Sequence, residues 1–139
     1  MDNTQLLKTL QEILEFEYTD VFIYNNEANL FKNKIKNSKN LVTLYKEFAL
    51  DELSHADIIS RKIIELGSAP LWQYKQIELS DSIRDSLKRH LERELNAIQT
   101  YTKLINQLND RSLKTQLKRI LANEKEHLQE ITEFLRKLK

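Results

Sequence analysis

Apolar residues recur along this chain at steps of three, four and seven positions, in four separate segments. That spacing places them on one face of an α-helix, which has 3.6 residues per turn. The pattern breaks at an asparagine-rich segment, at a segment that contains the single proline, and at an Asn109-Asp110 turn. The sequence therefore predicts an all-α chain whose helices span about residues 4–33, 41–66, 81–108 and 111–138.

The connection between the second and third helices is long and shows no helical period. We expect Gly67 to end the second helix, Ser80 or Asp81 to cap the third, and Trp72 to pack the linker down. A helix of about 26 residues is roughly 39 Å long, and a linker of about 14 residues reaches roughly 46 Å. The linker can therefore cross the full length of a helix. Two antiparallel helical hairpins joined by one such crossover form a ferritin-like four-helix bundle.

The two halves of the chain repeat each other. A shift of 77 positions superposes the first helix on the third, and a shift of 72 superposes the second on the fourth. These shifts place Glu17 on Glu94, Glu52 on Glu124 and His55 on His127. Two hairpins with the same inward pattern can pack about a pseudo-two-fold axis, so we expect residues 1–139 to form a single domain.

Each apolar stripe is interrupted near its middle by titratable residues. An unpaired carboxylate at such a position costs several kcal/mol. Four glutamates would be neutralised by two divalent ions, and Glu-x-x-His places both side chains on one face of a helix. One such motif from each of two helices, with one glutamate from each of the others, is the carboxylate di-iron arrangement. The predicted metal ligands are Glu17, Glu52, His55, Glu94, Glu124 and His127. The alternative is a plain bundle with buried Glu–His pairs or exposed charges.

Other polar residues near these motifs allow two interpretations each. Tyr24 and Tyr101 lie two turns after the lone glutamates, where they either hydrogen-bond the metal-binding carboxylates or pack as core aromatics. His90 is interpreted as a surface or hydrogen-bonded histidine in preference to an extra ligand. Asp51 and Asp57 flank the first motif and either orient His55 or face water.

Composition narrows the class of protein. The chain has no cysteine, so thiolate metal sites and iron–sulfur clusters are excluded. The net charge of +1 gives no reason to expect a nucleic-acid partner, and the lysines of residues 32–39 are interpreted as a solvated loop. The sequence contains neither an apolar segment of membrane-spanning length nor a recognisable signal peptide, so we expect a cytoplasmic protein.

Taken together, these residues resemble the ferritin-like superfamily, in particular the bacterioferritin and rubrerythrin types. The segment Asp51–Asp57 is similar to the second-helix motif of bacterioferritins, and Glu124–His127 matches their fourth-helix motif. The resemblance implies the same six ligands, with Glu52 and Glu124 as bridging carboxylates. It also implies that Tyr24 and Tyr101 correspond to tyrosines beside the metals, and a homodimer is expected.

The departures from these relatives also carry expectations. Leu53 stands where bacterioferritins have their haem-binding methionine, so no haem is expected. The sequence ends with the fourth helix, which argues against a cage. Cysteines of a rubredoxin domain are absent, and Ala97 stands where rubrerythrins have an extra glutamate.

The implied function is a cytoplasmic di-iron oxidoreductase that reduces H2O2 or O2, as a rubrerythrin-like peroxidase of oxidative stress or as a ferroxidase. Two iron ions are expected, manganese or a mixed Fe/Mn centre is an alternative, and the electron donor is unknown. The alternative functions are haem-free iron storage and a metal-free helical interaction bundle.

Overall fold

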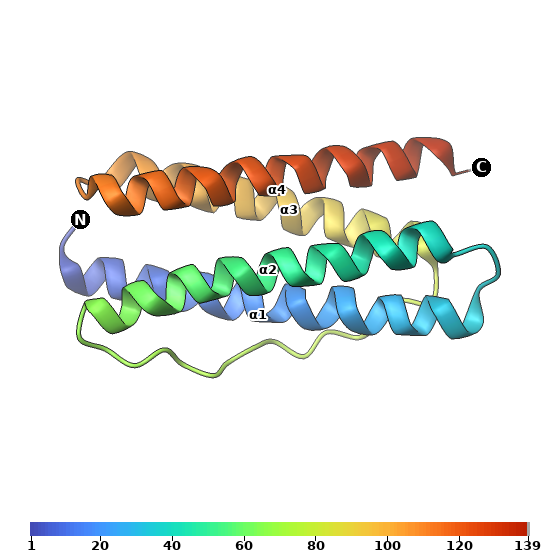
Figure 1. The fold of residues 1–139 in the computed structure, drawn as a ribbon, viewed down its shortest axis with the longest axis horizontal. Coiled ribbons are helices and arrows are strands. Elements are labelled where there is room, and N and C mark those ends of the chain that lie inside the picture. The colour runs from blue at the N-terminus through green and yellow to red at the C-terminus, as the bar shows by residue number, and fades with distance from the viewer. Residues whose placement is uncertain (139) are drawn as a thin grey trace. The chain divides into compact units, whose positions relative to one another are not determined.

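The structure is a computed structural model that describes residues 1–138, and it forms four α-helices with no strand among those residues (Figure 1). Every helix end lies within two residues of the position that the apolar pattern predicts. The helices are α1 (Asn3–Lys34), α2 (Lys39–Glu65), α3 (Ile83–Gln107) and α4 (Arg111–Lys137). The chain divides into two compact units, residues 1–81 and the part from Ser82 onward, and each is described by itself.

Local hydrogen bonds explain where the helices begin and end. Asp2 forms a capping box with Gln5 at the start of α1. The expectation that Ser80 or Asp81 caps α3 was wrong, because the Ser82 side chain accepts the hydrogen bond from the Asp85 backbone N–H. At the end of α2, Gly67 has a φ of 87°, the left-handed conformation that glycine adopts without strain.

The first unit is an antiparallel hairpin of α1 and α2 with an aromatic core. The Tyr24 ring lies 5.1 Å from the Tyr45 ring and 5.3 Å from the Phe48 ring, both edge-on. Each such ring pair contributes about 0.5–1.5 kcal/mol beyond the area that it buries. This packing fixes the register in which the two helices lie side by side.

The linker after α2 belongs to the same unit and runs along α1 (Figure 1). Three α1 side chains hold it at intervals of eight residues: Gln11 bonds the backbone of Ala69 and Leu71, Thr19 that of Lys75, and Glu27 that of Ser80. The expectation that Trp72 packs the linker down was wrong, since its side chain is 93% exposed. Hydrogen bonds to α1 attach the linker instead.

The second unit is the hairpin of α3 and α4, in which Asp110 caps α4 through the backbone N–H of Leu113. The turn between the helices is short, as the Asn109-Asp110 pair predicted. Its buried apolar residues include Leu87, Tyr101, Leu104, Leu113, Leu117, Ile120 and Ile131. Among the described residues, no helix has the length and apolar character needed to cross a membrane.

Candidate metal centre

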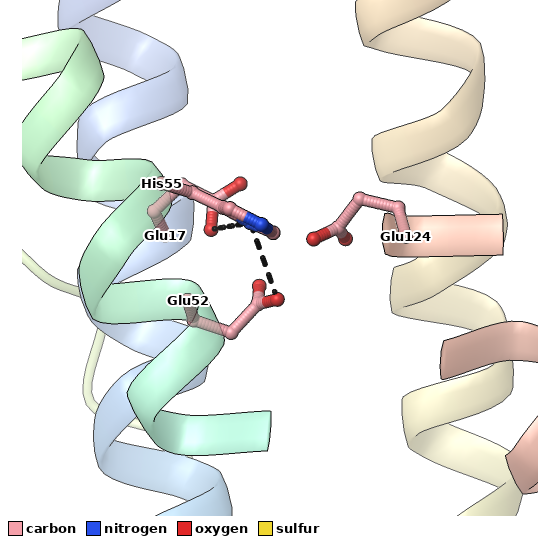
Figure 2. Close-up of side chains that lie close together, drawn as sticks. All are labelled: Glu17, Glu52, His55 and Glu124. Atoms are coloured by element: carbon pink, nitrogen blue, oxygen red, sulfur yellow. Dashed lines mark ion pairs between the residues drawn. The ribbon is translucent and has the colours of Figure 1, made fainter. Parts of the chain in front are cut away.

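The first hairpin brings three of the predicted ligands together, and we call them the first half-site: Glu17, Glu52 and His55. Glu17 lies on α1, while Glu52 and His55 lie three residues apart on one face of α2. The Nδ1 atom of His55 lies 3.5 Å from Glu17 Oε2 and 3.5 Å from Glu52 Oε1. Figure 2 shows these three side chains pointing toward one another, with both contacts dashed.

The second hairpin repeats the arrangement as the second half-site: Glu94 on α3 with Glu124 and His127 on α4. The Nδ1 atom of His127 lies 3.4 Å from Glu94 Oε1 and 4.0 Å from Glu124 Oε1. In both half-sites the same ring nitrogen therefore faces two carboxylates, one from the partner helix and one from its own. The internal repeat of the sequence is a repeat of local structure.

All six side chains are buried. The four glutamates have no exposed surface, and the two histidines are 5% and 1% exposed. Each half-site holds two carboxylates and one imidazole, so even with a protonated histidine its three side chains carry a net charge of −1. A buried charge of this kind is stable only when a cation balances it or when the group takes up a proton.

The separations fit a divalent metal ion. Within each half-site, one ligand atom from every residue lies within 4.8 Å of the others. Two donor atoms that each lie about 2.1 Å from a common ion are roughly 3.0–3.5 Å apart at ordinary coordination angles. Three of the four N···O distances, at 3.4–3.5 Å, fall in that range and are longer than a normal hydrogen bond, while the His127–Glu124 distance of 4.0 Å is longer than the range. Carboxylate oxygen with imidazole nitrogen suits iron, manganese and zinc.

Burial and contacts help to choose between the two interpretations that the sequence allowed for several polar residues. Tyr24 and Tyr101 are buried, and Tyr24 packs against two aromatic rings, as a core residue does. His90 is fully buried, so of the expected surface or hydrogen-bonded histidine the surface alternative was wrong and the hydrogen-bonded one stays a prediction. Asp57 is exposed and pairs with Arg61, which agrees with a side chain that faces water. Asp51 is half-buried.

Two buried carboxylates on α1 escaped the sequence analysis. Asp20 and Glu27 are both without exposed surface. Glu27 accepts a hydrogen bond from the backbone N–H of Ser80 at 3.0 Å. Their counterparts in the second hairpin are Ala97 and Leu104, which are not acidic. A search for acidic residues that recur in both halves of the sequence therefore does not find Asp20 and Glu27. Their steps of three from Glu17 and from Tyr24 would have placed them on the inward face.

Comparison with known proteins assigns the family. The sequence profile of the ferritin-like domain family matches residues 7–139, which include both half-sites. The chain belongs to the ferritin-like domain family. A comparison with curated proteins finds no match. The family assignment confirms the resemblance that the two Glu-x-x-His motifs indicated.

Solved structures agree with this ferritin-like assignment. A ferritin-like, diiron-carboxylate protein from Bacillus anthracis is 26% identical, with a TM-score of 0.88 over 97% of this chain and 99% of that one. The bacterioferritin BfrA of Mycobacterium tuberculosis is 21% identical, with a TM-score of 0.87 over 98% of this chain and 87% of that one.

A third match is the bacterioferritin of Rhodobacter capsulatus, a structure with a metal-free dinuclear site and haem iron. It is 18% identical, with a TM-score of 0.87 over 97% of this chain and 86% of that one. At this identity the two bacterioferritins show the fold alone. The predicted ferritin-like four-helix bundle is confirmed.

Proposed function

We propose that the two half-sites together bind a pair of iron ions, and that the protein is a di-iron oxidoreductase. The observation that carries the proposal is a buried cluster that occurs once in each hairpin. Each cluster combines one glutamate with one Glu-x-x-His motif, and its ligand atoms lie within 4.8 Å of one another. Membership of a family that includes a diiron-carboxylate structure at 26% identity supports it. Four carboxylates and two ferrous ions form a neutral set, which removes the cost of the buried charges.

The six side chains take matched roles. His55 and His127 would each supply a nitrogen, one to each ion, and Glu17 and Glu94 would supply terminal carboxylates. Glu52 and Glu124, each three residues before a histidine, would act as the shared carboxylates. Manganese can replace iron at the same ligands, because oxygen and imidazole donors do not select between them.

When bound, a ferrous pair supplies two electrons to O2 or H2O2. The buried apolar rows around the half-sites exclude bulk water from the cluster. Leu53 offers no sulfur, so we propose that the protein binds no haem. We further propose a cytoplasmic location. Peroxide reduction and ferroxidase activity would use the same six ligands. Iron storage would use ferroxidase activity to load iron.

The test begins with anaerobic titration of Fe²⁺ into metal-free protein. We expect two ions per chain for the wild type, and fewer for Glu52→Ala and Glu124→Ala. The matched control is Glu126→Ala, which removes an exposed glutamate two residues from Glu124 and should bind as the wild type does. Binding of well under two ions by the wild type, or equal binding by all variants, would refute the proposal and favour a metal-free bundle.

The reaction is then separated by oxidant. Loaded protein is mixed with O2 or with H2O2, and the rise of ferric absorption is followed for each. Faster oxidation by H2O2 supports a peroxidase, and oxidation by O2 at the faster rate supports a ferroxidase. Incorporation of hundreds of iron ions into a very large particle would show iron storage instead.

A further inference from the structure

Positive charge is concentrated around the turn that joins α1 to α2 (Figure 1). Residues 28–46 contain five lysines and neither aspartate nor glutamate, so this segment carries a charge of +5. The whole chain carries +1, and the remaining 17 basic residues stand against 21 acidic ones, so all other positions together carry −4. Separation of charge within one chain produces a local field that attracts anions.

A hollow of about 960 Å³ lies at this turn, and we call it the lysine hollow. Four of the five lysines line it: Lys32, Lys36, Lys39 and Lys46. They come from the end of α1, from the turn itself and from α2. The fifth lysine, Lys34, is exposed but does not line the hollow. Among the described residues, Glu47 is the one carboxylate in the lining, so the lining carries a net charge of +3.

Neutral side chains hold Lys46 in place. Its Nζ atom donates hydrogen bonds to the side-chain oxygens of Asn25 at 2.7 Å and Asn29 at 2.8 Å, both on α1. An amide oxygen orients an ammonium group without neutralising its charge. The ammonium has three N–H bonds, so the third is left for an anion in the lysine hollow. The two asparagines therefore fix a positive charge in position before any ligand binds.

Hydrogen bonds within the turn give it a defined conformation. The Ser38 side chain lines the lysine hollow but is 7% exposed, and its hydroxyl donates a shared hydrogen bond to the carbonyls of Phe31, at 3.1 Å, and Ile35, at 2.9 Å. Asn37 has a φ of 62°, in the left-handed region that asparagine tolerates. A defined turn lowers the entropic cost of placing Lys36 and Lys39 around a ligand.

The lysine hollow also offers apolar surface. Ile35, Val42 and Leu50 contribute to its lining, and Leu50 is 66% exposed. Its volume lies within the range of roughly 300–1,000 Å³ that is usual for small-molecule sites. A hollow of this size has room for a body attached to the anionic group. Its lining therefore suits a ligand with a multiply charged anionic part and a less polar part.

We propose that the lysine hollow binds a small molecule that carries phosphate groups. A phosphate monoester has a charge of about −1.5 to −2 at pH 7, and a further phosphate brings the charge close to the +3 of the lining. Lysine binds phosphate as a point charge, so four lysines from three segments can surround it without a fixed geometry. A monocarboxylate, with a single charge, would balance only a third of the lining charge. The proposal does not depend on metal binding.

The test is isothermal titration calorimetry of the metal-free protein with ADP, inorganic phosphate and adenosine. We expect one ADP per chain, weaker binding of inorganic phosphate, and no binding of adenosine, since the lysines supply most of the attraction. Affinity should fall when the ionic strength is raised from about 0.05 M to about 0.3 M, because salt screens exposed charges. Inorganic phosphate that binds as tightly as ADP would identify free phosphate as the ligand of the same site.

Variants locate the binding. Lys46→Gln should raise the dissociation constant of ADP about tenfold, while Lys46→Arg, which keeps the charge, should remain within about threefold of the wild type. Lys36→Gln changes an exposed turn residue, so it tests the same site with little effect on folding. It should weaken binding about threefold or more.

The matched control is Lys34→Gln, which removes the same charge from the same segment but outside the lysine hollow. It should change the dissociation constant by less than about twofold, because an exposed charge at a distance is screened. Equal weakening by Lys34→Gln and Lys36→Gln would show a general positive field without a site. That result, or the lack of saturable binding by both phosphate compounds, would overturn the proposal.

Discussion

Replacing one buried glutamate by glutamine should raise the stability of the metal-free protein and lower that of the metal-loaded protein. In the first half-site, Glu17 and Glu52 both lie 3.5 Å from the single imidazole of His55. Glu52→Gln removes one of the two negative charges and keeps the shape of the side chain. The Glu17–His55 pair that is left is neutral when the histidine is protonated, so these three side chains lose their net negative charge.

The size of the effect follows from burial. Removal of one buried negative charge from the half-site is worth on the order of 1–3 kcal/mol, which in a chain of this length raises the melting temperature by roughly 3–10 °C. An ion present at a hundred times its dissociation constant stabilises the wild type by about 2.7 kcal/mol, or roughly 10 °C. Glu52→Gln should lose most of the stabilisation by metal. The variant should therefore melt at a higher temperature than the wild type without metal, and at a lower temperature with it.

The assay is anaerobic thermal unfolding followed by circular dichroism, with and without Fe²⁺, at one protein concentration. Glu124→Gln should behave as Glu52→Gln does, because the two half-sites are equivalent. Glu126→Gln changes an exposed glutamate. It should change the free energy of unfolding by less than about 0.5 kcal/mol, both with and without Fe²⁺. A Glu52→Gln protein that melts lower without metal and retains the full Fe²⁺ shift would refute the reasoning.

Three smaller effects can be measured on the same protein. Gly67→Ala should cost about 1 kcal/mol in urea unfolding, because φ is 87° there while a Cβ would meet no atom within 4 Å; an unchanged midpoint would contradict this. Trp72→Ala should change the unfolding free energy by less than about 0.5 kcal/mol, since an exposed side chain loses no packing. The Arg136 guanidinium lowers the pKa of Glu133 by hydrogen bonding, so Arg136→Gln should raise that pKa in an NMR titration. The stabilisation from this pair is present above the pKa of a free glutamate and is lost as the pH falls through the lowered value.

Periodicity predicted the helices closely because each one buries a long apolar face. The same signal revealed Glu17 and Glu94, since a charge in an apolar row is conspicuous. The repeat then linked them to the two Glu-x-x-His motifs. These features depend on residues that are near each other in the sequence or in matching positions of the two halves.

The features that sequence analysis missed depend on distant contacts. The exposure of Trp72 results from the path of the linker, which side chains more than 50 positions earlier determine through hydrogen bonds to its backbone. No side-chain pattern in the linker encodes such bonds. Asp20 and Glu27 escaped for a related reason: they occur in one repeat only, and buried acids of a single helix resemble surface acids unless the helix angle is followed residue by residue.

In both half-sites it is Nδ1 of the histidine that faces the carboxylates. An imidazole that gives this lone pair to a cation keeps its proton on Nε2, so metal loading would hold His55 and His127 in one tautomer. Each ring then presents a single N–H bond on the side away from the glutamates. The two hairpins would thus carry equivalent donors through which surrounding groups adjust the basicity of the nitrogen ligands, and ¹⁵N chemical shifts would report both rings.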